Sequence, residues 1–407
     1  MKVIKVREFT YPTYVGGIET CLHQLCPALA RLGVNVTLLT CAEKGLPRKQ
    51  FIEGFEVRRV DFLGVIGALT SRLKVSGALY GLIARTLFLI ILPIHLIKAL
   101  GETGAEAIHV HCLCALSALP ASITKMLTGK PLIITMHGTF LGYYSKAIKP
   151  PLSWLISTAE KAYLRLGVYD KILVEDKYTY KLLMKLGISR EKISLLPYPG
   201  IKIEVFREVH SINALKDKLI ILHHGRLVPK RGLKNLIEAM PKVIGGFPEA
   251  TLIIAGEGPE KTRLKKLAEK LGLAQHVRFI GLAPYELIPA LVKSSTIVVN
   301  PSLVEGHSSS VIEAMAASKP VIATKVGGIT DIIRDGETGI LIEPENPDQI
   351  AEAIMKLLKN PKMMEAIGER ASKKAEEFSI ENLAKKEAQI YQEFSRRGNP
   401  SWTSSSS

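Results

Sequence analysis

The chain has 407 residues, of which 47% are hydrophobic and 23% charged, so its composition is that of a globular protein and excludes a disordered or fibrous one. At this length a single hydrophobic core is not expected to serve the whole chain, and we expect two domains. The net charge is +16; residues 1–200 carry 25 Lys and Arg against 13 Asp and Glu, and the remainder carries 29 against 25. The basic first half suits phosphorylated ligands or an anionic membrane surface, and the absence of nucleic-acid-binding motifs argues against DNA and RNA as partners.

The cysteines indicate a reducing compartment. All five lie in the first 114 residues, their number is odd, and they form no disulfide framework. The first residues, MKVIKVREF, are typical of a strand and not of a secretory signal, so we expect a cytoplasmic protein. We expect no metal site, because the spacing of the candidate ligands fits no zinc pattern and packing explains apolar cysteines. These candidates are Cys21, His23, Cys26, His109, His111, Cys112 and Cys114.

Apolar, strand-like segments alternate with helical patterns along the whole chain, which predicts βαβ units and parallel sheets. The first series of predicted strands covers 2–9, 34–40, 107–111, 131–135 and 170–175. The second series covers 219–225, 251–256, 276–281, 295–301 and 320–324. We therefore predict an α/β fold with two facing Rossmann-like, doubly wound domains and a cleft between them.

The domain boundary is predicted at 195-LLPYPGIKIE-204, which contains two prolines and a glycine, as an interdomain linker does. The first domain would then cover 1–197 and the second 198–380. A last helix over 381–395 has no strand after it, and we expect it to pack back on the first domain. Residues 396–407 are typical of a flexible tail.

Two apolar segments of the first half leave alternatives open. The segment 75–100 is interrupted by Arg85, and its uncharged run over 86–97 is too short to span a bilayer. It is either a buried core helix or an element that lies in the interfacial layer of a membrane. The stretch 143–167, which mixes aromatic residues with lysines, leaves the same alternatives open.

The stretch 300-NPSLVEGHSSSVIEAMAASKP-320 places Glu305 and Glu313 on either side of a loop of small residues that leaves a strand and enters a helix. Such a loop exposes backbone N–H groups at the positive end of the helix dipole, where a diphosphate can bind. The two carboxylates could then accept hydrogen bonds from the hydroxyl groups that flank the diphosphate of a nucleotide sugar. The alternative is structural, because Ser310 and Glu313 have the spacing of a capping box.

The stretch from Glu305 to Glu313, followed by 319-KPVIATKVGGITDIIRDGETGILIEPENPDQIAEAI-354, resembles the E-x7-E signature of retaining glycosyltransferases of family 4, which have the GT-B fold. The resemblance extends over nearly the whole chain. It includes 12-PTYVGGIETCLHQLCPALARLGVNVTLLT-40, 108-IHVH-111, 136-MHGT-139, 225-GRLVPKRGLKNLIEAM-240 and 252-LIIAGEGPE-260. Two departures concern the donor sugar and the hinge: His307 and Ser308 replace a usual phenylalanine and glycine, and 197-PYPGIK-202 lacks a usual asparagine-glycine pair.

The resemblance implies a role for each matching residue. Glu313 would bind the ribose hydroxyls, Glu305 would lie near the donor sugar, and His137 would face that sugar. Arg226 and Arg231 would contact the diphosphate, which suits a guanidinium group. The remaining donor-binding candidates are backbone or small-residue positions, namely Gly16, Gly17, Gly306, His307, Ser308 and Ser309. The chain has no Asp-x-Asp pair, so basic side chains and not a metal ion are expected to neutralise the leaving phosphate.

The resemblance thus implies a retaining, metal-independent hexosyltransferase without a cofactor. Its donor would be a UDP- or GDP-sugar bound by the second domain, its acceptor a lipid-linked or other glycan bound by the first, and its location the cytoplasm or an anionic membrane face. The alternatives are a non-catalytic nucleotide-sugar-binding or membrane-associated protein and a nucleotide-sugar epimerase. A dinucleotide-dependent oxidoreductase is disfavoured, because 256-GEGPE-260 is followed by Lys261 where the fingerprint has its third glycine.

Overall fold

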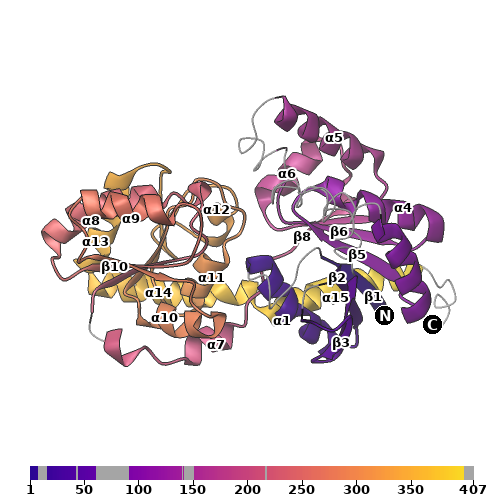
Figure 1. Ribbon diagram of the computed structural model, residues 1–407, viewed down its shortest axis with the longest axis horizontal. Coiled ribbons are helices and arrows are strands. Elements are labelled where there is room, and N and C mark those ends of the chain that lie inside the picture. Colours follow the sequence, from indigo (N-terminus) through magenta and orange to yellow (C-terminus); the bar gives the residue numbers. More distant parts are fainter. Residues whose placement is uncertain are drawn as a thin grey trace, which may run out of the picture. The chain divides into compact units, whose positions relative to one another are not determined.

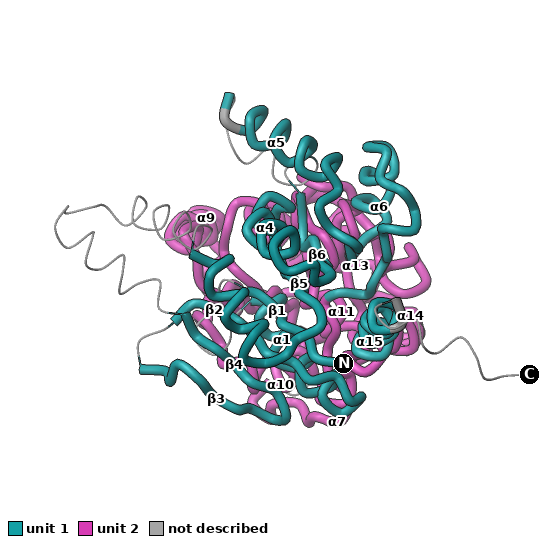
Figure 2. Tube along the Cα trace, turned by 90° about the vertical axis from the view of Figure 1, so that its right-hand side faces the viewer, with its two compact units in different colours: residues 1–198, 383–407 teal, residues 199–382 magenta. Residues whose placement is uncertain are grey.

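The computed structural model describes residues 1–7, 16–42, 45–60, 91–139, 141, 151–215 and 218–397. The chain forms two compact units, shown in teal and magenta in Figure 2. Unit 1 comprises Met1–Tyr198 together with Leu383–Ser407, and unit 2 comprises Pro199–Asn382. Each is an α/β unit built on a largely parallel sheet, as predicted.

Unit 1 has an eight-stranded sheet with the order β3-β4-β2-β1-β5-β6-β7-β8, in which only the β3–β4 pair is antiparallel. Its strands are β1 Lys2–Val6, β2 Asn35–Cys41, β3 Lys49–Ile52, β4 Phe55–Val60, β5 Ala107–Cys112, β6 Leu132–Met136, β7 Lys171–Val174 and β8 Ile193–Leu195. Its helices are α1 Gly17–Arg31, α4 Leu119–Thr128, α5 Leu152–Leu166, α6 Lys177–Lys185 and α15 Ile380–Arg397, with a further helical stretch over 91–103. The strand order reverses between β1 and β5, so the carboxyl ends of these two strands mark the switch point at which α/β sheets bind ligands.

The two faces of this sheet differ in polarity. One face is apolar and packs against the helical stretch 91–103, α4, α5 and α6. The other face carries Lys5, His109, His111 and Thr135, all of them buried. Helices α1 and α15 lie on this side of the sheet (Figure 1). Because side chains alternate across a strand, polar residues at alternate positions, such as His109 and His111 of β5, all lie on the same face.

The polar face of unit 1 depends on an ion pair between its first strand and its last helix. Lys5 of β1 contacts Glu387 of α15, and both side chains are fully buried. Glu387 also accepts hydrogen bonds from Tyr198 and from Tyr391, the latter over 2.5 Å. Buried charges cost several kcal/mol each unless they are paired and hydrogen-bonded, and here both conditions are met.

Unit 2 has a six-stranded parallel sheet with the order β11-β10-β9-β12-β13-β14. Its strands are β9 Ile220–His224, β10 Thr251–Ala255, β11 Val277–Gly281, β12 Ile297–Asn300, β13 Val321–Thr324 and β14 Ile340–Ile342. Its helices are α7 Ile203–Glu208, α8 Leu233–Gly246, α9 Lys261–Lys270, α10 Ile288–Ser294, α11 Ser309–Ala316, α12 Ile329–Ile332, α13 Pro347–Leu358 and α14 Pro361–Ala375. Apolar clusters cover both faces of this sheet, and its order reverses between β9 and β12.

All ten predicted strands are present, and the structure adds four that were not predicted: β3, β4, β8 and β14. In the predicted apolar run over 86–97, residues 91–97 are helical, and Leu92 and Leu96 pack into the core of unit 1 while Ile94 is exposed. Residues 86–90 lie outside the described part of the chain, as do residues 143–150 of the second apolar stretch. Among the described residues, no helix combines the length and the hydrophobicity needed to cross a bilayer.

We expect the Lys5–Glu387 pair to be essential for the stability of unit 1. Replacing Glu387 by Gln leaves the Lys5 ammonium group buried without a counter-charge, which should lower the free energy of unfolding by about 3–5 kcal/mol. Adding Lys5→Met to the same chain should recover a large part of that loss, since the uncompensated charge is then gone. Urea unfolding of the wild type and both variants measures these differences.

A matched control is the Lys374–Glu377 pair, in which the Glu377 side chain is 58% exposed. Glu377→Gln should change the free energy of unfolding by less than about 1 kcal/mol, as exposed pairs do. If Glu387→Gln were no more costly than Glu377→Gln, the buried pair would not have the structural role assigned to it.

Candidate functional site

The polar residues of unit 2 gather at the point where the strand order of its sheet reverses, between β9 and β12. Arg226 and Arg231 lie on the loop that follows β9, whereas Glu305 and Glu313 follow β12, which is the neighbour of β9 in the sheet. Because both strands are parallel, their carboxyl ends share one edge, and the four predicted residues therefore come from segments that begin at the same edge: Glu313 from helix α11 and the other three from the connections before α8 and α11. This is the arrangement that the strand pattern predicts for a ligand site.

Arg231 and Glu305 form an ion pair in which the guanidinium Nη1 contacts the carboxylate Oε2. Ser302 donates a hydrogen bond of 3.2 Å to the same carboxylate oxygen. The Nε–H of Arg231 is buried and has no hydrogen-bond partner among the described residues. A buried N–H without a partner is costly, so Arg231 retains a donor that an anionic ligand can satisfy.

Two further cations accompany this pair. Arg226 is exposed, whereas Lys230 is half-buried beside Glu305 and the two arginines. Burial lowers the pKa of Lys230, Glu305 opposes this effect, and the positive charges of Arg231 and Arg226 add to it. Lys230 was not predicted as a site residue, although it lies in the same quoted motif. Three cations next to one carboxylate leave an excess of positive charge, which suits a diphosphate.

The backbone of the β9–α8 loop is held between two neighbouring loops by close contacts at glycines. A Cβ at Gly258 would lie 2.3 Å from the carbonyl oxygen of Leu227, and one at Gly232 would lie 2.1 Å from that of Pro301. Gly232 also has φ of +62°, a conformation that favours glycine. The glycines of 256-GEGPE-260 therefore serve the packing of this loop, which explains why the segment only imitates a dinucleotide fingerprint.

Glu313 is buried in α11, and its Oε2 lies 3.6 Å from Nδ1 of His224 at the end of β9. Burial raises the pKa of Glu313 to about 8 and lowers that of His224 to about 4, so at neutral pH both groups are mostly uncharged and they do not form a true ion pair. The Nε2 atom of His224 has no hydrogen-bond partner among the described residues. His224 was not predicted, although a histidine that ends an apolar strand at this edge was a visible signal.

The capping-box alternative for Glu313 is wrong. The N-cap of α11 is Ser308 and not Ser310, and no side chain caps the helix. The Ser308 and Ser310 hydroxyls instead accept hydrogen bonds from the amide of Asn300, over 2.8 and 3.2 Å. The buried carboxyl group of Glu313 thus has no capping function.

The loop between the two glutamates presents mainly backbone. The His307 side chain is buried, with its ring against that of Phe378 and its Nε2 3.9 Å from Asp331. Ser308 is buried as well, whereas Gly306 and Ser309 are half-buried. Gly328 packs directly against this loop, because a Cβ there would lie 2.8 Å from the carbonyl carbon of Gly306. Any contact of His307 with a donor would therefore come from its backbone.

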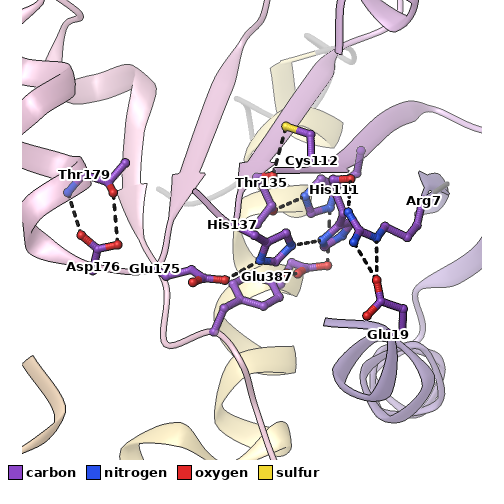
Figure 3. A network of polar contacts seen from close by, with 12 residues as sticks. Arg7, Glu19, His111, Cys112, Thr135, His137, Glu175, Asp176, Thr179 and Glu387 are labelled. Atoms are coloured by element: carbon purple, nitrogen blue, oxygen red, sulfur yellow. Dashed lines mark hydrogen bonds and ion pairs between the residues drawn. The ribbon is translucent and has the colours of Figure 1, made fainter. Parts of the chain in front are cut away.

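In unit 1, His137 directly follows β6 and lies in a buried polar network (Figure 3). Its Nδ1 contacts the carboxylate of Glu175, and its Nε2 lies 3.1 Å from Nδ1 of His111. Burial lowers the pKa of His137 to about 3 and that of His111 well below its usual value, so both rings are neutral. Glu175 was not predicted, because the strand pattern does not indicate that the ends of β6 and β7 carry interacting side chains.

Gly16 and Gly17 begin α1, with Gly16 as the N-cap. Near them, Arg7 at the end of β1 donates two hydrogen bonds, of 3.1 and 2.6 Å, to Glu19 in the first turn of α1 (Figure 3). Both side chains are buried. This pair ties together the two ends of the connection between β1 and α1, of which residues 8–15 lie outside the described part of the chain.

The candidate metal ligands take other roles. The five cysteines form no disulfide and are buried, and burial raises the pKa of Cys26 and of Cys112 to about 12, so these two thiols stay protonated. Among the described residues, His109, His111 and Glu387 place ligand atoms within 4.8 Å of one another. The Lys5 ammonium group already contacts Glu387 and lies 3.3 Å from His111 Nε2, so a cation of the protein itself occupies this cluster.

Comparison with known proteins agrees with this geometry. Residues 15–204 match the family Glycosyltransferase Family 4, and residues 205–374 match Glycosyl transferases group 1. The putative glycosyltransferase EpsD of Bacillus subtilis is 30% identical over 298 residues, which cover 69% of this chain and 75% of that protein. The chain belongs to the family 4 glycosyltransferases. It is a glycosyltransferase that moves a sugar from a nucleotide sugar to an acceptor.

Two further proteins are similar to this glycosyltransferase over nearly its whole length. The uncharacterized glycosyltransferase MJ1607 of Methanocaldococcus jannaschii is 28% identical over 406 residues, which cover 96% of this chain and 98% of that protein. The structure of Anabaena Alr3699/HepE in complex with UDP-glucose is 17% identical, covers 97% of this chain and 100% of that chain, and superposes with a TM-score of 0.72. The fold is therefore that of the GT-B glycosyltransferases, as predicted.

We expect Glu313 to make the glycosyltransferase less stable as pH rises. Its pKa is about 8 in the folded chain against an ordinary value of 4.5, so between these values the folded state holds a proton that the unfolded state releases. The free energy of unfolding should therefore fall across this window, by up to about 1.4 kcal/mol per pH unit. Glu313→Gln has no proton to lose, so it should be more stable than the wild type, by an amount that grows from pH 5 to pH 8.

Urea unfolding of both proteins at pH 5 and pH 8 measures this difference. Taking the difference between the two chains cancels the contribution of all other titrating groups. An equal change with pH in the wild type and in Glu313→Gln would show that Glu313 is ionised in the free protein.

Proposed function

We propose that this glycosyltransferase is a retaining, metal-independent hexosyltransferase that uses a UDP- or GDP-sugar and acts on a lipid-linked or other glycan acceptor. The observation that carries the proposal is the set of three cations, Arg226, Lys230 and Arg231, beside Glu305 at the switch point of unit 2. Unit 2 would bind the nucleotide diphosphate, and unit 1 the acceptor. The UDP-glucose bound by the similar Anabaena protein supports a nucleotide sugar of this kind.

The chemistry requires positive charge at the leaving group. As the bond from the anomeric carbon to the phosphate oxygen breaks, negative charge develops on the diphosphate, and fixed cations stabilise it without reorganising. The acceptor oxygen forms its bond on the same face of the sugar, and its proton leaves with the departing phosphate. Arg231 is suited to this role because its Nε–H has no partner within the described protein and its Nη1 is held by Glu305.

Glu313 would bind the ribose. Two ribose hydroxyls can donate to its carboxylate, which would offset the burial that keeps the group protonated in the free protein. Glu313→Gln should then weaken nucleotide binding by about 1.5–3 kcal/mol, the range for hydrogen bonds to a charged group. His137 would contact the transferred sugar, and the backbone at Gly16 and Gly17 would approach the phosphates.

A nucleotide-sugar screen tests the proposal. UDP-glucose, UDP-galactose, UDP-N-acetylglucosamine and GDP-mannose are compared by thermal shift, and the tightest binder is incubated with lipid-linked and soluble acceptors. A glycosylated product with the anomeric configuration of the donor supports the proposal. Binding without turnover indicates a non-catalytic nucleotide-sugar-binding protein, and a changed sugar on the nucleotide indicates an epimerase.

Activity should survive removal of divalent cations. Because side-chain cations are proposed to neutralise the leaving group, excess EDTA should leave the rate within about twofold, whereas Arg231→Ala should lower it on the order of 10²-fold, as loss of a transition-state donor does. Lys234→Ala is the matched control, since Lys234 is 57% exposed in the adjoining helix and pairs only with Glu238 among the described residues. Loss of activity on chelation, with recovery on adding Mg²⁺ or Mn²⁺, would overturn the metal-independent mechanism.

A membrane-bound acceptor is favoured by exposed apolar side chains on two helices of unit 1. On α4 these are Leu119, Ile123, Met126 and Leu127, and on α5 they are Trp154, Leu155 and Leu166. Both helices also carry exposed or half-exposed basic residues, such as Lys125, Lys161 and Arg165. Apolar side chains next to basic ones suit the interface of an anionic bilayer, where each cation near the surface contributes about 1 kcal/mol.

We therefore expect the protein to pellet with anionic phosphatidylglycerol vesicles at low salt and to be released as salt screens the surface charge. Met126→Glu combined with Trp154→Glu should abolish pelleting, because it removes apolar contact and adds negative charge. The control is Val205→Glu, a 45% exposed position on α7 of unit 2, which should not alter pelleting. If the wild type stayed in the supernatant at low salt, the acceptor would have to be a water-soluble one.

A further inference from the structure

Both ring nitrogens of His137 are engaged inside unit 1. Nδ1 contacts Glu175 at the end of β7, and Nε2 lies 3.1 Å from Nδ1 of His111 on β5. The His111 and His137 rings stack with their centroids 5.4 Å apart, and the ring of Tyr198 meets both of them edge-on. All of these side chains are buried, so the ring of His137 has one orientation that satisfies its neighbours.

The hydrogen-bond partners determine the tautomer of each ring. A carboxylate only accepts hydrogen bonds, so Nδ1 of His137 carries the proton and its Nε2 is an acceptor. Nδ1 of His111 must then be the donor to His137, which leaves Nε2 of His111 as an acceptor. The Lys5 ammonium group lies 3.3 Å from this atom and, having only donors, fits that role. The tautomers are thus inferred from a chain of hydrogen bonds in which each group donates to the next, from Lys5 through His111 and His137 to Glu175.

The start of this chain is anchored by α15. Lys5 is paired with Glu387, and Glu387 in turn accepts from the hydroxyls of Tyr198 and Tyr391. His109 lies beside the chain but is not part of it, because its Nδ1 contacts the Tyr391 hydroxyl and its Nε2 the Thr135 hydroxyl, each over 2.6 Å. The chain therefore has a charged residue at each end and two neutral rings between them.

We propose that Glu175 and His111 are positioning residues for His137: they fix its ring plane and hold it in the form that carries its proton on Nδ1. The inference rests on the proposed function only in assuming that His137 contacts the transferred sugar. Neither Glu175 nor His111 needs to touch the substrate. A change at either residue should alter turnover through the ring of His137 and leave nucleotide binding, which is proposed for unit 2, unchanged.

The test compares Glu175→Met, which removes the acceptor at similar size, with Glu175→Gln, which keeps an acceptor oxygen. Asp176→Ala is the matched control, because Asp176 is the next residue and caps α6 by accepting from the backbone N–H of Thr179 over 2.7 Å (Figure 3). Two quantities are measured on each protein. The first is the tautomer of His137, from the ¹⁵N chemical shifts of its ring nitrogens. The second is the rate of hydrolysis of UDP-glucose or GDP-mannose with water as acceptor, using the donor that the wild type hydrolyses.

We expect His137 to be in the Nδ1–H form in the wild type and to lose this form in Glu175→Met. The turnover of Glu175→Met should be lower by tenfold or more, whereas its Kd for the nucleotide should stay within twofold of the wild type. Glu175→Gln should retain the Nδ1–H form and much of the turnover. Asp176→Ala should lower the melting temperature but preserve both the tautomer and the turnover. The signals of His137 are identified by their absence in His137→Ala.

Two further outcomes separate this inference from the proposed function. If Glu175→Met left the tautomer of His137 unchanged, the positioning role would be overturned whatever the activity. If the tautomer changed but turnover did not, and His137→Ala were also fully active, the proposed contact of His137 with the sugar would be wrong.

If Glu175→Met did not fold, His111→Asn and His111→Leu would provide the same comparison. The amide N–H of Asn can replace the Nδ1–H of His111 as donor, and Leu cannot. His111→Leu should therefore lower turnover by tenfold or more where His111→Asn preserves it, and equal turnover in the two variants would contradict the inference.

Discussion

The fully buried ion pair between Lys5 and Glu387 is the contact on which the architecture of unit 1 depends. A lysine in the central strand of a parallel sheet would be excluded from the interior if no carboxylate met it there. Once the pair is present, its remaining hydrogen-bonding capacity has to be satisfied as well. The neighbouring positions on the same face of the sheet are therefore histidine and threonine, where most parallel sheets have valine or isoleucine, and Tyr391 of α15 contacts His109 from the helix.

Unit 2 places most of its polar side chains at the edge of its sheet and not on a face. Both faces of its sheet are covered by apolar clusters, and its polar groups gather at the carboxyl edge, where loops and a helix N-terminus supply partners. Burial also shifts the pKa values of titrating groups in both units. Burial depresses the pKa of histidines in both units, to about 4 for His109 in unit 1 and for His224 in unit 2, and it raises the pKa of Glu313 in unit 2 to about 8. Acid should therefore destabilise both units as pH falls from the ordinary histidine value of 6.5 towards about 4, whereas Glu313 makes unit 2 sensitive to alkali as well.

The sequence predicted the local features of this structure better than the long-range ones. The long apolar strands were all found, because their periodicity is visible within a few residues. Of the missed strands, β8 and β14 have only three residues each, whereas β3 and β4 form an edge hairpin around Glu53 and Gly54. At the candidate site of unit 2, the two glutamates and two arginines were visible in motifs. The cap of α11 was assigned two residues too late, because three consecutive serines could each have served. The chain of hydrogen bonds from Lys5 to Glu175 was not predicted, since Lys5 and His111 are 106 residues apart and His111 and His137 are 26 apart. No pattern in one sequence relates such distant positions.

Unit 1 is built from two segments that are far apart in the sequence, Met1–Tyr198 and Leu383–Ser407, and they are synthesised at different times. During synthesis the first 198 residues leave the ribosome long before α15 exists, so the strand that carries Lys5 has no partner for its charge until nearly the whole polypeptide has been translated. Unit 2 is continuous in sequence and needs nothing from either end of the chain to complete its sheet. The later-made half can thus reach its native state first, and the earlier-made half becomes stable only when the last helix arrives.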